Sequence, residues 1–280
     1  MNRPVPWPLT VVRLLVLVAG AVVMVTPFAY LLAISFTEQS FVLTMPPQFI
    51  PDPPTLANYA KALTVSDVPR YFLNSLYVAS VSTLLALLLS SMMGYAFARF
   101  RFPGRELIFR LLLIGLMIPA VMLLIPQFIL TKYLGLLDNH LGLILFYVAG
   151  SLAINTFLLR GFFESIPGEL DEAMQVDGAN AWTRYWRLAI PLARPGLATA
   201  TIFSFFAAWD EFAWALTIIN DPDLQTLPIA IRLFAGTGNN AVQWGLVFAA
   251  SAIAIVPVII VFLIFQRHFV QGLTSGAVKG

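Results

Sequence analysis

Long apolar runs separated by short charged segments constrain this chain more than any other feature. Six runs reach the length of about 20 residues that an α-helix needs to cross a bilayer. They cover residues 14–36, 72–97, 107–130, 141–159, 196–219 and 245–265. Lipid cannot hydrogen-bond the backbone, so such segments must be helices or a closed barrel, and unbroken apolar runs favour helices. We therefore predict an all-α polytopic membrane protein, with six transmembrane helices in a single domain over residues 1–280.

The composition excludes several classes of protein. Only 11% of the residues are charged, whereas roughly a quarter are charged in soluble domains. The absence of cysteine excludes disulfides, thiol catalysis and thiolate metal sites. His140 and His268 lie far apart in the sequence, so we expect no metal site. No arrangement of Ser, His and acidic residues indicates an enzyme, and nothing indicates a nucleic-acid partner.

The distribution of Lys and Arg indicates the orientation, because cytoplasmic segments carry an excess of these residues. If both termini are cytoplasmic, the outer segments hold only four of the 16 basic residues, which are Lys61, Arg70, Lys132 and Arg232. We therefore expect cytoplasmic termini. The first apolar run is long and no small-residue cleavage site follows it, so we expect this span to be retained and not removed as a signal peptide. The segment 162–195 is then the longest cytoplasmic connection.

That connection collects charge and carries helix start and stop signals. Eight of the 30 charged residues (16 basic plus 14 acidic) lie between residues 164 and 194. Pro167 suits the first turn of a helix, Gly178 suits its left-handed end, and Asn180 suits the cap of a second helix. The pattern predicts a short acidic helix, a glycine turn and an amphipathic helix that Pro191 and Pro195 end.

Two interpretations of this connection are open. A connector at the lipid headgroups explains the second helix, whose Trp182, Tyr185 and Trp186 accompany Arg184 and Arg187. Anionic lipid would repel the acidic first helix, however. A protein partner with basic groups explains that helix better.

The same segment resembles the EAA loop of permease subunits in ATP-binding-cassette (ABC) importers. It reads Glu172-Ala173-Met174, three residues, Gly178, nine residues and then Leu188-Ala189-Ile190-Pro191. The spacing is that of the family pattern, with apolar departures at Met174, Leu188 and Ile190. Other stretches are similar to the maltose-type carbohydrate importers, and the tail GLTSGAVKG resembles the second of their two permease subunits.

The resemblance implies that this loop contains a coupling helix between the fourth and fifth spans that fits a groove on a cytoplasmic ATPase. It assigns ATPase coupling to Glu169, Glu172, Ala173, Met174, Asp177, Gly178, Leu188 and Pro191. The alternative for Glu172 is a first-turn acid that stabilises the helix by about 0.3–1 kcal/mol. For Gly178 the alternative is a simple helix cap.

The resemblance also implies partners and a setting. The expected partners are a second permease in a heterodimer, a dimer of the ABC ATPase, an extracellular solute-binding protein and the lipid bilayer. No G-x-x-x-x-G-K-[ST] motif is present, so ATP and Mg belong to the partner ATPase and this chain needs no cofactor. The expected location is the bacterial plasma (inner) membrane. The expected role is half of a passage for a sugar or sugar-like solute.

Polar and aromatic residues inside the spans suggest a substrate path, because charges in lipid usually face protein or water. The candidates are Asn74, Tyr77, Trp209, Asp210, Glu211 and Trp214. At 100° per residue, Glu211 is predicted to share a face with Ser204 and Ala208, while Asp210 faces the side of Trp214. Ordinary helix packing or an interfacial belt explains each of these residues equally well.

The outer loop between the fifth and sixth spans holds a further candidate. Its tip, Gly236, Thr237, Gly238, Asn239 and Asn240, has little bulk and is expected to enter the binding protein. An ordinary turn is the alternative. For the whole chain, the alternative function is an ion-coupled secondary transporter that uses Asp210 and Glu211, although such carriers often show internal repeats and none is found here.

Overall fold

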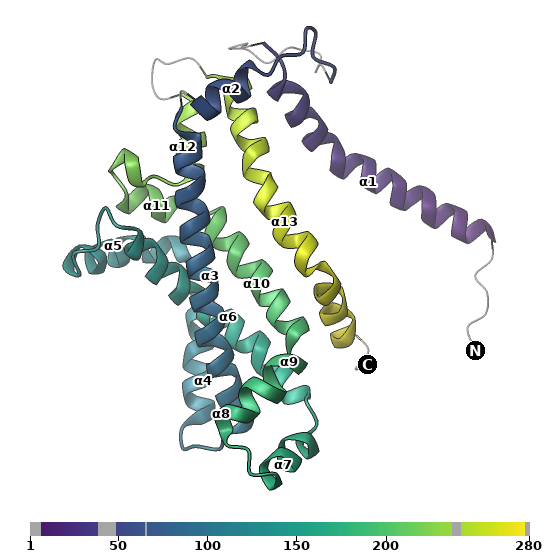
Figure 1. The fold of residues 1–280 in the computed structure, drawn as a ribbon, viewed down its shortest axis with the longest axis vertical. Coiled ribbons are helices and arrows are strands. Elements are labelled where there is room, and N and C mark those ends of the chain that lie inside the picture. Colours follow the sequence, from purple (N-terminus) through teal and green to yellow (C-terminus); the bar gives the residue numbers. More distant parts are fainter. Residues whose placement is uncertain (1–6, 39–48, 65, 237–241, 278–280) are drawn as a thin grey trace. The chain divides into compact units, whose positions relative to one another are not determined.

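The computed structural model describes residues 7–38, 49–64, 66–236 and 242–277, which form helices and no strand. This confirms the all-α class. In chain order the elements are α1 (Trp7–Ser35), α2 (Ala57–Thr64), α3 (Val68–Arg99), α4 (Arg105–Ile114), η1 (Gly115–Met117), η2 (Ala120–Leu123), α5 (Leu124–Tyr133), α6 (His140–Ser165), α7 (Gly168–Val176), α8 (Ala181–Arg184), η3 (Tyr185–Ala189), α9 (Ile190–Leu192), α10 (Arg194–Trp209), α11 (Ala213–Ile218), η4 (Pro222–Leu224), α12 (Leu227–Phe234) and α13 (Trp244–Ala277) (Figure 1).

Among the described residues, four helices are long and apolar enough to cross a membrane. These are α1, α3, α6 and residues 244–267 of α13. Two bent pairs, each counted as one span, would raise the number to six: residues 105–117 with 120–133, at 96°, and residues 181–192 with 194–209, at 78°. The six-span topology therefore remains a prediction.

Two of the predicted spans are interrupted. The run 107–130 breaks after Ile118, where Pro119 is extended with φ −58° and ψ 129°. Pro126 causes no break, because it lies in the first turn of α5, where a missing N–H costs nothing. The run 196–219 is divided between α10 and α11 by residues 210–212.

The chain forms two compact units, and the first comprises residues 1–69 and 230–256. The buried Asn58 of α2 donates from Nδ2 to the carbonyl oxygens of Ser35, at 3.1 Å, and Thr37, at 2.7 Å. A Cβ atom on Gly245 would lie 2.5 Å from Asn58 Nδ2. Glycine at this position therefore allows α13 to begin against α2. By contrast, residues 7–29 of α1 are exposed along their whole length.

The second unit comprises residues 70–229 and 257–280, and α3 and α6 each contribute to two apolar clusters in it. The first cluster includes Val78, Leu143, Ile144, Trp214 and Ile218. The second cluster includes Tyr95, Leu159, Phe163, Tyr185 and Ala189. Within this unit α11 lies near one end of α3, and α7 and α8 lie near the other end (Figure 1).

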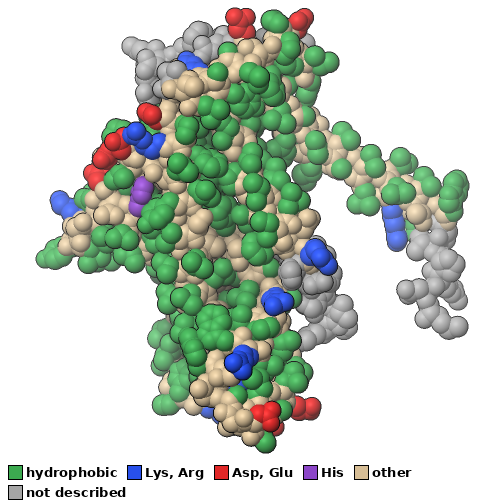
Figure 2. Space-filling model, in the orientation of Figure 1, with side chains coloured by type: hydrophobic (Ala, Val, Ile, Leu, Met, Phe, Trp, Pro, Cys, Tyr) green, Lys and Arg blue, Asp and Glu red, His purple; other side chains and the backbone are tan. Residues whose placement is uncertain are grey.

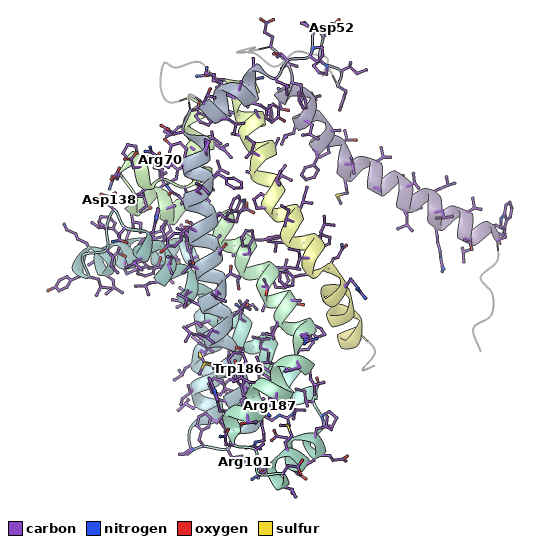
Figure 3. All side chains as sticks on the ribbon, in the orientation of Figure 1. Asp52, Arg70, Arg101, Asp138, Trp186 and Arg187 are labelled. Carbon is purple, nitrogen blue, oxygen red and sulfur yellow. The ribbon has the colours of Figure 1, made fainter. Side chains whose placement is uncertain are left out.

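Charged side chains gather near both ends of the second unit, and hydrophobic side chains dominate the visible surface between them (Figure 2). Arg70 and Asp138 lie toward the α11 end, whereas Arg101, Trp186 and Arg187 lie toward the α7 end (Figure 3). This distribution suits a unit with a lipid-facing middle and two polar ends.

Candidate functional site

The segment after α6 carries the first candidate site, and it is attached to α3 where it begins. α6 ends at Ser165, Ile166 is extended, and α7 begins at Gly168 after Pro167, as the sequence predicts. Arg99, at the end of α3, donates from Nη2 to the Ile166 carbonyl oxygen at 2.7 Å. The start of α7 is therefore fixed to a long helix of the same unit.

The end of α7 is closed by a glycine turn. Gly178 has a left-handed φ of 80°, which confirms its predicted conformation. Its N–H donates to the Gln175 carbonyl oxygen at 3.1 Å, and the Ala179 N–H donates to the Met174 carbonyl oxygen at 2.9 Å. This pair of bonds is the Schellman motif, which satisfies the last carbonyls of a helix.

An ion pair joins the two sides of this turn. Arg184 Nη1 in α8 lies 2.8 Å from Asp171 Oδ2 in α7, and the two side chains are 13% and 17% exposed. A sheltered, charge-assisted contact of this kind holds two elements together more firmly than an exposed pair does. The two residues are 13 positions apart, and no local signal in the sequence predicts that they meet.

The second helix begins as predicted but does not continue as predicted. Asn180 Oδ1 accepts hydrogen bonds from Thr183 N, at 2.8 Å, and Thr183 Oγ1, at 3.0 Å, which confirms the cap. A wider π segment, η3, then interrupts the helix. Pro191 does not end it, because this residue lies within α9, and Pro195 lies in the first turn of α10. Such π segments are frequent at functional sites.

Tyr185 anchors η3 to the body of the unit. Only 2% of this residue is exposed, and its hydroxyl lies 2.7 Å from Ser91 Oγ in α3. The interpretation of this helix as a connector at the lipid headgroups therefore does not hold for Tyr185. Trp182 and Trp186 are 56% and 43% exposed. Tyr185 and Trp186 follow Trp182 by three and four residues, so the three rings lie close together on a helix. Their spacing alone could not predict which of the three rings packs against α3.

The residues expected to contact the ATPase divide into two groups. Glu169, Glu172, Ala173, Asp177 and Gly178 are exposed, whereas Met174, Leu188 and Pro191 are partly buried. The first turn of α7 contains Glu169 and Asp171 but not Glu172. The helix dipole therefore explains Glu172 less well than it explains Glu169.

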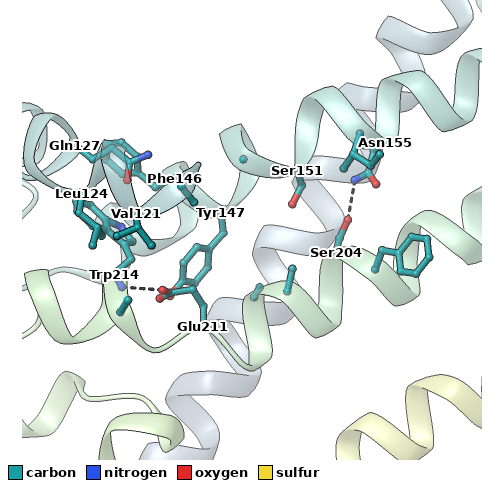
Figure 4. Close-up of a pocket in the computed structure, with 17 residues that line it drawn as sticks. Val121, Leu124, Gln127, Phe146, Tyr147, Ser151, Asn155, Ser204, Glu211 and Trp214 are labelled. Carbon is teal, nitrogen blue, oxygen red and sulfur yellow. Dashed lines mark hydrogen bonds between the residues drawn. The ribbon is translucent and has the colours of Figure 1, made fainter. Parts of the chain in front are cut away.

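A cavity of about 500 Å³ in the same unit forms the second candidate site. Its walls come from η2 and α5, from α6, from α10 and from the segment that leads into α11 (Figure 4). Glu211 and Trp214 line it, as do Gln127, Tyr147 and Ser151. Two of the six residues predicted for a substrate path thus meet at one cavity.

Glu211 is held by three hydrogen-bond donors. Its Oε2 accepts from the Tyr147 hydroxyl, at 2.7 Å, and from Ala215 N, at 3.0 Å. Its Oε1 accepts from Trp214 N at 2.7 Å. The carboxylate therefore caps the first turn of α11 and also links this helix to α6.

The predicted placement of Asp210 and Trp214 on one face is wrong. The estimate of 100° per residue assumed a helix that continues to residue 219, but α10 ends at Trp209. Trp214 consequently lines the cavity together with Glu211, whereas Asp210 is exposed and does not line it. Ser204 and Ala208, which precede the break, line the cavity together with Glu211, but so do Phe203 and Ala207 from the neighbouring side of α10.

The other predicted path residues lie elsewhere. Asn74 donates from Nδ2 to the carbonyl oxygens of Asp223, at 2.9 Å, and Gln225, at 2.8 Å, and so fixes a loop to α3. Tyr77 is exposed beside the ring of His140. Trp209 is buried and stacks on Phe205 with a ring distance of 5.6 Å.

The predicted loop that contacts the binding protein falls largely outside the described residues. Gly236 is described and has a left-handed φ of 82°. Thr237, Gly238, Asn239 and Asn240 lie outside the described part of the chain. That prediction therefore stays open.

Comparison with known proteins places these features in a family. The model of the family described as "Binding-protein-dependent transport system inner membrane component" matches residues 86–275. The diacetylchitobiose uptake system permease protein NgcG of Streptomyces coelicolor is 35% identical over 263 residues, which cover 94% of this chain and 87% of that protein. The trehalose/maltose transport system permease protein MalG of Thermococcus litoralis is 35% identical over 277 residues, which cover 96% and 98%.

A solved structure is similar over nearly the whole chain. A chain in the crystal structure of a bacterial ABC transporter involved in the import of the acidic polysaccharide alginate superposes with a TM-score of 0.80. It is 25% identical in sequence, and the match covers 96% of this chain and 99% of that one.

Proposed function

Since the chain belongs to the family of inner membrane components of binding-protein-dependent transport systems, we propose that it forms half of the passage of an ABC importer for a sugar. It is a multi-pass membrane protein and a carbohydrate-type ABC permease subunit, and such subunits are not themselves enzymes. The solute reaches it on an extracellular binding protein, and ATP hydrolysis on a separate ATPase dimer, which holds ATP and Mg, drives transport.

The braced helix α7 is the observation that carries this proposal. Glu169, Glu172 and Ala173 are exposed on it, so they can enter a groove with a basic rim. The contact between Asp171 and Arg184 keeps α7 from moving independently of α8. An element held at both ends transmits displacement, whereas a loose loop would absorb it.

Two connections would pass that displacement to the helices of the passage. Arg99 joins the start of α7 to α3, and Tyr185 joins η3 to Ser91 in the same helix. The chain then continues through α9 into α10, which lines the cavity. Closure of the ATPase pair would thus shift α3 and α10 together.

The remaining assignments follow from the same proposal. The chain has six spans and cytoplasmic termini, and it lies in the bacterial inner membrane. In this topology α7 is on the cytoplasmic face, where the ATPase binds. A second permease completes the passage. The relatives named for diacetylchitobiose and for trehalose or maltose support an oligosaccharide as the substrate class. Ion coupling through Asp210 and Glu211 is less well supported, because Asp210 is exposed and does not line the cavity that Glu211 lines.

Reconstitution tests the proposed function. The chain is co-expressed with the second permease, the ATPase and the binding protein from the neighbouring genes, and the complex is placed in proteoliposomes. Sugar uptake should require both ATP and the binding protein, and it should persist when ion gradients are collapsed. Uptake that continues without ATP but stops with the gradient would support an ion-coupled carrier instead.

A further inference from the structure

We propose that the cavity of about 500 Å³ is a saccharide subsite within this chain and that Glu211 makes it selective for uncharged sugars. The inference rests on the proposed function, because it supplies a substrate contact to the passage. The volume lies within the roughly 300–1,000 Å³ of small-molecule sites. Such sites combine apolar walls with a few placed polar groups, and this cavity has both.

The Glu211 carboxylate is fixed in place but not neutralised. Its three donors, Tyr147 Oη, Trp214 N and Ala215 N, are all uncharged groups. A carboxylate offers about four acceptor positions, so capacity remains for a hydroxyl of a ligand. Because the carboxylate is already oriented, it can bind that hydroxyl without the cost of ordering a flexible side chain.

Two further polar side chains on the wall have no hydrogen-bond partner among the described residues. These are the Gln127 amide of α5 and the Ser151 hydroxyl of α6, and both line the cavity. At the end near Ser151, Asn155 Nδ2 donates to Ser204 Oγ at 2.7 Å, and this leaves the Ser204 hydroxyl proton for another acceptor (Figure 4). These groups can donate and accept, as sugar hydroxyls require.

Aromatic rings flank the polar groups. The Phe146 and Trp214 rings lie 4.8 Å apart at an angle of 59°, and the Tyr147 ring carries the hydroxyl that holds Glu211. The apolar face of a sugar ring can pack on such rings while its hydroxyls reach the polar groups. A fatty acyl chain would fill the apolar part but would leave the polar groups unsatisfied.

The charge of the lining points to an uncharged ligand. Among the described residues that line the cavity, Glu211 is the only charged one. An acidic sugar would place a second negative charge where like charges repel strongly and where the described lining offers no cation to compensate. Repulsion of this kind excludes wrong ligands as effectively as contacts select the right one.

A double variant tests the subsite with little risk to the fold. Gln127→Ala with Ser151→Ala removes two groups that support nothing else in the described chain. In the complete reconstituted complex, uptake at saturating sugar-loaded binding protein should fall about tenfold. The matched control is Ser251→Ala with Gln266→Ala, because the hydrogen bonds of those side chains to described residues all go to carbonyls of their own helix. The control should transport as the wild type does.

A direct binding measurement tests the selectivity. The purified complex without binding protein is dialysed against labelled maltose, trehalose or diacetylchitobiose as uncharged probes, and against an alginate disaccharide as the acidic probe. Binding should be restricted to uncharged probes, and Glu211→Gln should reduce the preference for them. Ala208→Leu, which fills the cavity, should abolish binding of every probe.

Two outcomes would overturn the inference. One is an acidic probe that binds the wild type as well as the uncharged probes do. The other is wild-type behaviour of the variants: the double variant and Ala208→Leu would both transport sugar and bind the probes as well as the wild type does. In either case, ATP-dependent sugar uptake by the wild-type complex would leave the proposed function intact. A wild-type complex without such uptake would contradict the proposed function itself.

Discussion

Asp171 in α7 and Glu211 before α11 are both partly buried carboxylates, and the protein satisfies them in different ways. Asp171 meets a guanidinium, and the pair locks one helix onto the next. Within the described part of the chain, Glu211 meets only a hydroxyl and two backbone N–H groups. The charge of Asp171 is therefore cancelled inside the protein, while Glu169 and Glu172 remain exposed beside it. The charge of Glu211 is not cancelled and faces a cavity.

This difference separates structural acids from acids that are available to a partner. On α7 the internal ion pair holds in place the helix that carries the exposed acids. At the cavity Glu211 alone caps the start of α11 and also exposes its charge to the cavity. Substitutions in the two regions should therefore have different consequences.

The largest effect is expected from breaking the ion pair. Arg184→Ala leaves the sheltered Asp171 without a cation, so hydrogen exchange of the amides of residues 168–176 should accelerate by roughly tenfold to a hundredfold. Arg187→Ala is the matched control, because Arg187 is exposed and forms no ion pair among the described residues. Equal exchange in the two variants would show that the pair does not brace α7.

A smaller effect is expected from the glycine turn. Gly178→Val places a branched residue at φ 80°, which should destabilise the turn by about 1–2 kcal/mol. Gly178→Asn should cost less, because asparagine tolerates this conformation. Hydrogen exchange of α7 measures both variants. If asparagine and valine are equally disruptive, backbone conformation is not the cause.

The hydroxyl beside the cavity should matter still less. Tyr147→Phe removes one of the three donors to Glu211, and the two backbone donors remain. We expect a loss of about 1 kcal/mol in the stability of the complex, seen as a lower thermal midpoint. Tyr133→Phe alters a tyrosine that is 90% exposed and should change nothing. A midpoint for Tyr147→Phe equal to that of Tyr133→Phe would contradict the proposed role of the hydroxyl.

The smallest effect is expected at Asp138, a carboxylate that is exposed, unlike Asp171 and Glu211. Hydrogen bonds from the backbone N–H groups of Asn220 and Asp221 lower the pKa of Asp138. Its stabilising contribution is therefore complete above the unfolded pKa, about 3.9, and is lost as the pH falls through the lower folded pKa. Asp138→Asn should remove that pH dependence from hydrogen exchange at residues 220 and 221. An unchanged pH profile would contradict this.

The features that could be predicted from the sequence are those that depend on neighbouring residues, namely where helices start, end and are capped. The start of α7 after Pro167, its end at Gly178 and the cap at Asn180 all follow from signals within a few residues, and the structure confirms them. The exposure of Glu172 also agrees with the resemblance to the coupling loop. These features need no knowledge of tertiary packing.

Contacts between distant segments could not be predicted in this way. The partner of Asp171 lies across a turn, and the partner of Tyr185 is Ser91 in another helix. Because the helix breaks after Trp209, Trp214 lies on the side of Glu211. The predicted face of Trp214 was wrong because it assumed one continuous helix. Tyr147, Gln127 and Ser151 were missed because isolated polar residues in an apolar run carry no sign of where they converge.

The central claim is that α7 contacts the ATPase, and a cysteine probe tests it most directly. The chain contains no cysteine, so Ala173→Cys introduces a unique thiol on the exposed surface of α7. In the assembled complex a short bifunctional reagent should link this thiol to the ATPase, and ATP should change the yield. No cross-link to the ATPase, or labelling of the thiol by an impermeant reagent added outside intact cells, would contradict the account.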